Sequence, residues 1–205
     1  MKQVTLVLAL ALSAPTFAMD RIVEEFGQAP AYPNIASAVA ASVDGDRIII
    51  KNRAGNIPWI ENIAINKSLE FLSFANDDFF YVQGNYTVTG ATDRVVNIVS
   101  MRNTSGSIIF GSGGGVRATT VRIMDSYFVN GIIDMEDNNV QADIVGCTLI
   151  NGSVSINYGN VVGCVIDASQ TTDEGISITG TASGFPLDTC AIVGNKVKGA
   201  ILYEG

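Results

Sequence analysis

The sequence predicts an all-β fold, namely a right-handed, single-stranded parallel β-helix with a short N-terminal capping helix. Three observations lead to this prediction: the composition, a repeated apolar pattern, and the matching of residues between successive repeats. Of the 205 residues, 47% are hydrophobic and 16% are charged, as in a folded domain rather than a disordered chain. Twenty-one glycines and only five prolines accompany many Val, Ile, Asn, Ser and Thr residues, which is typical of short strands joined by tight turns.

Two segments, 121–135 and 142–156, carry the same pattern when one is shifted by 21 residues against the other. In both, apolar residues alternate with polar ones, a bend interrupts the alternation, and an Asn-Gly pair turns the chain. Alternation with a period of two indicates short strands with one buried face. The shift places Arg122 over Asp143, so we expect an outward ion pair between adjacent coils.

Further copies of the pattern begin near residues 160 and 191, with polar insertions between them. A unit of about 21 residues cannot bury its own apolar face, so successive units must stack on one another. An antiparallel sandwich is the alternative, but it requires no matching in register between successive units. Coils are therefore expected over about 47–205. The last one stops in mid-pattern, which indicates that the solenoid continues beyond residue 205 into further C-terminal coils or domains.

The phrase IVGC at 144–147 recurs as VVGC at 161–164 and as IVGN at 192–195. Its last position is held in successive copies by Ser126, Cys147, Cys164 and Asn195. We predict that these four side chains point inward as a stacked ladder, in which Cys acts as a small apolar residue. Cys147 and Cys164 would lie close enough for a disulfide, but parallel side chains are poorly aimed for its dihedral angle, so free thiols are expected. The chain has no histidine, which excludes His-dependent catalytic triads.

Residues 1–18 are predicted to be a secretory signal peptide. They contain one Lys, an apolar run from about Val4 to Ala14, and small residues up to Ala18. A membrane anchor is the alternative, but the run is too short to span about 30 Å of hydrocarbon. We therefore expect cleavage after Ala18, a β-helix domain over 19–205 with no membrane span, and a secreted or cell-surface location.

The capping helix is expected at about 34–43, with Asn34 as its N-cap, and the first strand is expected at Arg47–Lys51. This order, followed by Glu61-Asn62-Ile63 and by INKSL at 65–69, resembles the N-terminal cap of pectin-lyase-like right-handed parallel β-helix repeat proteins. The likeness is greatest to exported proteins of Bacteroidetes-type bacteria. The resemblance implies the fold but no single activity, because that superfamily includes lyases, hydrolases, epimerases and adhesins.

Two functions remain open. The first is a secreted or cell-surface scaffold that binds polysaccharide or a surface partner along its outer face. The second is the N-terminal part of a carbohydrate-active enzyme, either a polysaccharide lyase or a glycoside hydrolase. The middle coils lack the paired acids and the Lys or Arg constellation that the resemblance implies for an enzyme, so the scaffold is favoured and no catalytic residue is assigned.

Two groups of residues are candidate binding sites, and each also has a plainer interpretation. Aromatic side chains near the cap can stack on sugar rings or can fill the core; these are Trp59, Tyr81 and Tyr86. Acidic side chains at one turn can bind Ca²⁺ or simply face solvent; these are Asp134, Glu136 and Asp137. No other cofactor is expected.

The formal net charge is −8, and loss of Lys2 with the signal peptide lowers it to about −9. Since no basic cluster is present, nucleic acid is not expected as a partner. The acidic balance also weighs against an acidic polysaccharide, unless bound Ca²⁺ inverts the local charge.

Overall fold

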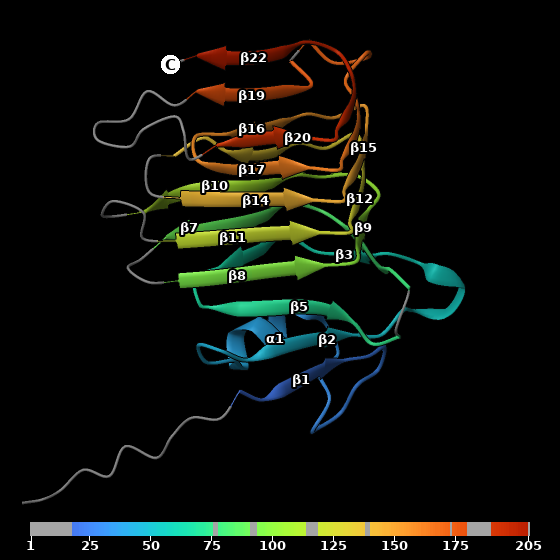
Figure 1. Cartoon of the computed structure of the whole chain (residues 1–205). Helices are drawn as coiled ribbons and strands as arrows, with labels where there is room; N and C mark the ends of the chain where they lie inside the picture. Colours follow the sequence, from blue (N-terminus) through green and yellow to red (C-terminus); the bar gives the residue numbers. More distant parts are fainter. Residues whose placement is uncertain are drawn as a thin grey trace, which may run out of the picture.

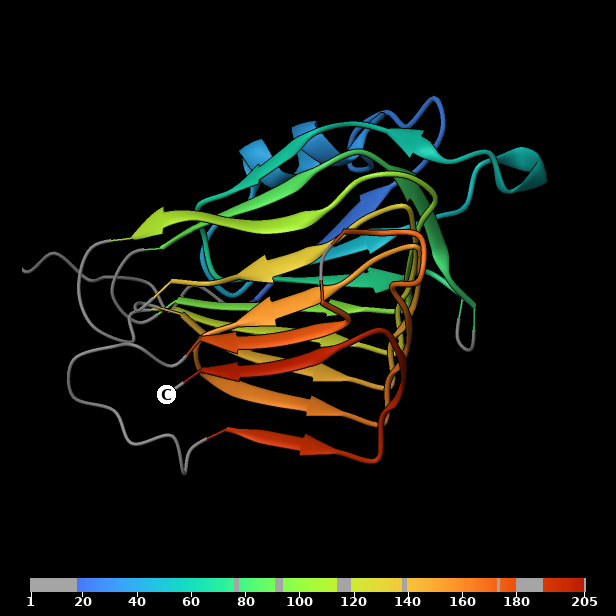
Figure 2. The ribbon, with the colours of Figure 1, turned by 90° about the horizontal axis from the view of Figure 1, so that it is seen from above.

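The computed structural model describes residues 18–75, 78–90, 94–113, 119–137, 140–172, 174–179 and 190–204. These residues form a parallel β-helix with three sheets, stacked coil upon coil in Figure 1 and arranged around a common interior in Figure 2. Each strand pairs in parallel with its counterpart one coil away. The predicted all-β parallel β-helix is therefore confirmed.

The three sheets, which we call A, B and C, follow one another around each coil. Sheet A contains β1 (Asp20–Val23), β2 (Arg47–Ile50), β5 (Leu69–Ser73), β8 (Arg94–Val99), β11 (Thr119–Met124), β14 (Val140–Val145), β17 (Gly159–Val162) and β20 (Ala191–Val193). Sheet B contains β3 (Trp59–Ile60), β6 (Phe80–Gln83), β9 (Met101–Asn103), β12 (Tyr127–Val129), β15 (Thr148–Ile150), β18 (Val165–Asp167) and β21 (Lys196–Lys198). Sheet C contains β4 (Ile63–Ile65), β7 (Tyr86–Gly90), β10 (Ile108–Gly113), β13 (Ile133–Met135), β16 (Val154–Ile156), β19 (Ile176–Thr179) and β22 (Ile201–Glu204).

The shift of 21 residues read from the sequence is the register of two adjacent coils. Phe128 pairs with Leu149 in sheet B, as expected. In sheet A, Arg122 lies opposite Asp143, with 3.6 Å between Arg122 Nε and Asp143 Oδ2. The predicted outward ion pair is present, and its exposure limits its contribution to less than about 1 kcal/mol.

Alternation along the strands produces one continuous core. In β14, Val140, Ala142 and Ile144 are buried, while the residues between them face outward. Because the register is kept from coil to coil, the buried side chains of all three sheets join into a single apolar cluster along the solenoid axis.

Helix α1 (Ile35–Ala41) covers the N-terminal end of this core. It begins where Asn34 Oδ1 accepts a hydrogen bond from the Ser37 N–H at 2.8 Å, as predicted for an N-cap. Its buried residues Ile35, Ala38 and Val39 face a core that would otherwise meet water at this end, and the helix contacts β1, β2 and β4. A short 3-10 turn, η1 (Ala54–Asn56), follows β2.

The second coil holds both ends of α1 by charge. The Glu61 carboxylate accepts hydrogen bonds from the N–H groups of Ile35 and Ala36, at 3.0 and 2.8 Å. The Lys67 ammonium group donates to three carbonyl oxygens at the other end, those of Val39, Ala40 and Ser42, at 2.9, 3.0 and 2.7 Å. An anion thus lies at the helix N-terminus and a cation at the C-terminus, which the helix dipole favours.

Strand β1 was missed by the prediction, which placed the first strand at Arg47. The strand does not show the apolar pattern of the others, because Arg21 occupies an inward position where an apolar residue is expected. Arg21 is accommodated by the fully buried Asp46, which accepts hydrogen bonds from Arg21 Nε at 2.8 Å and from the N–H groups of Met19 and Val43 at 2.9 and 3.0 Å. An ion pair between the partly buried Arg21 and the fully buried Asp46 therefore attaches the first strand to the second coil.

A column of glycines runs along the corner between sheets B and C. A Cβ atom on any of them would lie 1.9 to 2.2 Å from a carbonyl oxygen of the preceding coil, and they are Gly84, Gly106, Gly131 and Gly152. At Gly131 the atom met is the Gly106 oxygen at 1.9 Å. Only glycine fits, because the obstacle is backbone that is itself fixed by the stack.

Replacing Gly131 by Ala should lower the free energy of unfolding by about 3 kcal/mol, because two coils must separate locally. A matched control is Gly163→Ala, where φ is +64° but no atom lies within 4 Å of the new Cβ. The control should cost about 1–2 kcal/mol through backbone strain alone. Denaturant titration followed by circular dichroism measures both losses, and equal losses would contradict the steric explanation.

Asp46 makes stability depend on pH. Burial alone would raise the pKa of Asp46, but the N–H groups of Val43 and Met19 and the Arg21 guanidinium outweigh it and hold the pKa below its usual value. The stabilisation is therefore present above about pH 4 and is lost as the pH falls through the lowered pKa of the folded protein. Asp46→Asn should cost about 2–3 kcal/mol at pH 7 and progressively less below pH 4.

Unfolding in denaturant at pH 7 and pH 3 measures this difference. Asp20→Asn is the matched control, because Asp20 forms an exposed ion pair with Arg47 at 2.7 Å and should contribute less than about 1 kcal/mol. A loss in Asp46→Asn that is the same at both pH values would refute the assignment.

Candidate functional site

Sheet B presents three outward side chains on consecutive coils, which we call the aromatic column: Tyr81 in β6, Arg102 in β9 and Tyr127 in β12. Arg102 Cζ lies 5.6 Å from the centroid of the Tyr81 ring and 4.7 Å from that of the Tyr127 ring. The guanidinium is thus held between two rings by cation–π contacts. All three side chains are half-buried, so the column is ordered by its own packing and still reaches the surface.

In the part of the chain that the structure describes, no acidic side chain forms an ion pair with Arg102. Other basic side chains are bound, for example Arg53 to Glu25 at 2.8 Å and Arg94 to the Thr89 carbonyl oxygen at 2.9 Å. Within the described ranges, Arg102 and Lys196 are the basic residues with neither an ion pair nor a hydrogen bond. Both belong to one column of sheet B, because the register continues from Tyr127 through β15 and β18 to Lys196.

A groove of about 310 Å³ lies beside the aromatic column, at the corner between sheets B and C. Gln83, two residues after Tyr81 in β6, belongs to its wall, together with Ile60, Glu61, Asn62, Gly84, Asn85, Ser105 and Gly106. The side chains of Asn62 and Asn85 brace successive coils, since each Oδ1 accepts a backbone N–H of the next coil, at 2.8 and 2.9 Å. The groove is therefore lined with amide and backbone groups that are fixed in position.

A second cleft, of about 460 Å³, lies next to this groove and shares Ile60 and Glu61 with it. Phe26, which is 87% exposed, and Trp59 contribute aromatic walls. Trp59 itself is only 6% exposed, because it stands at the inward position of β3, opposite the buried Val82, and belongs to the core. The Arg53 guanidinium lies 5.4 Å from the centroid of its ring, and its Nε1 donates to the Lys51 carbonyl oxygen at 3.1 Å. Trp59 therefore forms part of the wall of the cleft, but the Arg53 guanidinium already covers a face of its ring.

The three aromatic residues proposed as sugar platforms therefore lie in different environments. Tyr81 is outward, Trp59 is largely covered, and Tyr86 is wholly buried. Tyr86 packs edge-on against Phe71, with ring centroids 6.1 Å apart, and burial raises the pKa of its hydroxyl well above the usual value. Tyr86 cannot meet a ligand without unfolding, so at this position the core interpretation holds.

The three acidic residues considered for Ca²⁺ do not converge. Asp134 Oδ1 accepts the Glu136 N–H at 3.1 Å, and Glu136 Oε1 accepts a hydrogen bond from Ser177 Oγ at 3.3 Å. Asp137 donates its backbone N–H to the Met135 carbonyl oxygen at 2.9 Å. Among the residues that the structure describes, no group of three His, Cys, Asp or Glu side chains is arranged to hold a metal ion.

The expected ladder lies at the corner between sheets A and B. Ser126, Cys147 and Cys164 are buried on successive coils, and the Cys164 N–H donates to Asn195 Oδ1 at 2.7 Å. All three cysteines of the chain are free thiols, and both a hydrogen bond with Cys164 and burial raise the pKa of Cys147. Cys147 and Cys164 therefore occupy packing positions.

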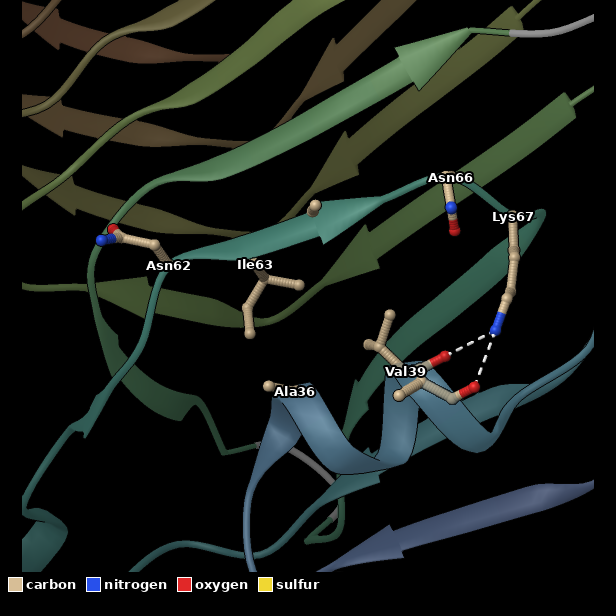
Figure 3. Close-up of a pocket in the computed structure, with 8 residues that line it drawn as sticks. Ala36, Val39, Asn62, Ile63, Asn66 and Lys67 are labelled. Atoms are coloured by element: carbon tan, nitrogen blue, oxygen red, sulfur yellow. Dashed lines mark hydrogen bonds between the residues drawn. The ribbon is translucent and has the colours of Figure 1, made fainter.

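A cleft of about 410 Å³ lies between α1 and β4 (Figure 3). The side chains that line it are mainly small or aliphatic, and they include Ala36, Val39 and Ile63. The Lys67 side chain is directed at the carbonyl oxygens of the helix, as the dashed lines show, so it is committed to holding α1. The cleft therefore lacks a charged group available to a ligand.

The prediction missed Arg102 and Tyr127, which complete the aromatic column. A shift of 21 residues relates Tyr81 to Arg102, but the next step, from Arg102 to Tyr127, is 25 residues, so a constant shift does not reach Tyr127. Their position within the strand could have identified them. In β6, β9 and β12 each residue of the aromatic column directly precedes an inward one.

Neither a protein-family model nor a curated protein nor a solved structure matches the chain. In the described part of the chain, no helix is both long and apolar enough to cross a membrane.

Proposed function

We propose that this chain is a secreted or cell-surface scaffold, related to the pectin-lyase-like β-helix repeat proteins, that binds polysaccharide along the outer face of sheet B. The observation that carries the proposal is the aromatic column of Tyr81, Arg102 and Tyr127. Aromatic faces pack against the apolar faces of sugar rings, and a guanidinium donates to hydroxyl or carboxylate oxygens.

The arrangement suits a polymer better than a single sugar. The column repeats outward groups at the coil spacing of about 4.8 Å, and the neighbouring groove extends the same face towards the cap. Several weak contacts to one chain of sugars then add, because the first contact raises the effective concentration of the next unit.

Arg102 favours a polysaccharide with carboxylate groups at this point. It is a cation without an acidic partner in the described residues, and a carboxylate can accept two of its N–H donors at once. The net negative charge of the whole chain repels such a ligand at long range. Added salt should therefore weaken the local attraction and the general repulsion together.

The proposal that the chain is exported rests on residues 1–18. Removal of these residues would also affect how strand β1 is attached. Cleavage after Ala18 would leave Met19 as the first residue, and its nitrogen lies 2.9 Å from Asp46 Oδ1. A free α-amino group is charged at neutral pH, so processing would convert a hydrogen bond into an ion pair with a buried carboxylate. Strand β1 would then be attached more firmly.

Production of the full chain in a bacterial host tests export. The protein should be recovered from the periplasm or the medium with Met19 as its first residue, as measured by intact mass and N-terminal sequencing, because the apolar run directs secretion. A chain that starts with Met19 directly is the control and should stay in the cytoplasm. Full-length protein retained in the cytoplasm would count against export.

The double variant Tyr81→Ala/Tyr127→Ala should bind a polysaccharide ligand about tenfold more weakly, because two ring contacts of about 0.5–1 kcal/mol each are lost. Arg102→Gln should weaken binding to uronate polymers more than binding to neutral ones. Affinity electrophoresis and calorimetry on a panel of neutral and uronate polysaccharides measure both effects. Phe74→Ala is the matched control, because Phe74 is an exposed aromatic with a cation, Lys51, over its ring but lies outside sheet B.

Two outcomes would overturn this function. Unchanged affinity in the Tyr81 and Tyr127 variant would remove the aromatic column as the binding face. Release of new reducing ends or unsaturated ends from any polymer by the wild-type chain would replace the scaffold with a carbohydrate-active enzyme.

A further inference from the structure

The outer face of sheet A carries an apolar stripe. The last outward residue of every strand is apolar, and the parallel register stacks these residues in one line, although the pairing of β5 with β8 ends one residue before Leu72 and Val99. The residues of the stripe are Ile22, Ile49, Leu72, Val99, Met124, Val145, Val162 and Val193. Val145 is 37% and Val193 is 56% exposed. In Figure 1 the strands β8, β11, β14 and β17 face the viewer with no other element in front of them. A line of aliphatic side chains this long on an outer face indicates a surface that another molecule covers.

A polar column runs beside the stripe, two residues earlier in each strand. From the first coil to the seventh it consists of Asp20, Arg47, Glu70, Asn97, Arg122, Asp143 and Asn160. The neutral Asn97 is its centre. Two coils before Asn97 stands Arg47 and two coils after it stands Asp143; one coil before stands Glu70 and one coil after stands Arg122. At one and at two coils from the centre, the residues on the two sides carry opposite charges; at three coils, Asp20 on one side corresponds to the neutral Asn160 on the other.

We propose that this face binds a second copy of the chain, with the two solenoids antiparallel and a two-fold axis along β8 through Asn97. Such an axis inverts the order of coils and keeps each column opposite itself. Arg47 then faces the partner's Asp143, and Glu70 faces the partner's Arg122. The two copies of Asn97 face each other, and an amide can both donate and accept.

The same axis brings the apolar stripe onto itself. Val99 meets its own copy, Leu72 meets the partner's Met124, and Ile49 meets the partner's Val145. Two sheets that pack face to face are held about 10 Å apart by interdigitated side chains, which residues of this size can fill. The polar column and the stripe therefore both satisfy one symmetry operation.

The charges select this axis over its neighbours. An axis moved by half a coil towards the N-terminus would place Arg47 against the partner's Arg122 and Asp20 against the partner's Asp143. An axis moved by half a coil the other way would place Glu70 against the partner's Asp143. Like charges that face each other at an interface cost several kcal/mol, so these registers are disfavoured.

The size of the face is adequate for a stable dimer. Seven coils span about 30 Å and strands of six residues span about 20 Å, which gives about 600 Å² in flat projection. The accessible area is larger, because side chains stand up from the sheet, and it approaches the ~800 Å² per partner of a standard interface.

The test combines solution mass with charge reversal. Sedimentation and light scattering over a wide range of protein concentration should show a dimer for the chain that begins at Met19. Glu70→Arg and Arg122→Glu should each raise the dissociation constant at least about tenfold, since each creates two like-charge contacts across the axis. An equimolar mixture of the two variants should dimerise again, because every contact between the two different copies is then between opposite charges.

Met124→Glu should also dissociate the dimer, whereas Val165→Lys, an exposed apolar residue of sheet B, should not. Circular dichroism of each variant checks that the solenoid is folded. A wild-type chain that stays monomeric, or charge variants that fail to recombine, would overturn the proposal. Neither outcome bears on polysaccharide binding by sheet B, which a monomer can carry out.

Discussion

The backbone hydrogen bonds between coils are the constraint on which the rest of this molecule depends. Each strand is hydrogen-bonded to its equivalent one coil away, so every side chain stands about 4.8 Å above an equivalent one. Gly131 shows how strict this is, because its Cα lies against the Gly106 carbonyl and leaves no room for a methyl group. The same stacking lets Ser126, Cys147 and Cys164 follow one another in a position that requires a small buried side chain.

That constraint explains which parts of the fold can be read from the sequence. Where two coils have the same length, as between residues 121 and 156, a constant shift gives the register directly. The same reasoning fails at β1, where an inward Arg21 interrupts the apolar pattern and is compensated by Asp46, which is far away in the chain. A local pattern cannot reveal a position whose partner is supplied by another coil.

The candidate site was only partly predictable for a related reason. Tyr81 and Tyr86 lie five residues apart and look equivalent in the sequence, but a corner at Gly84 separates them, so that one faces outward and the other enters the core. Arg102 was recognisable as a basic residue, but its place between two rings depends on two coils of unequal length, with 21 residues from Tyr81 to Arg102 and 25 from Arg102 to Tyr127. The position of a residue within its strand determines whether its side chain faces outward, whereas its spacing from other residues in the sequence does not.

Core packing does not explain which residues occupy the outward columns, because any hydrophilic side chain could occupy an outward position. Sheet A combines an aliphatic stripe with opposite charges on the two sides of Asn97, and sheet B combines two tyrosines with an arginine that has no acidic partner among the described residues. If both proposals hold, sheet A is buried between two copies and the dimer carries two aromatic columns that run in opposite directions. A polysaccharide bridging or folding back over both would gain from the higher effective concentration of the second column, so self-association through one sheet would strengthen binding through another.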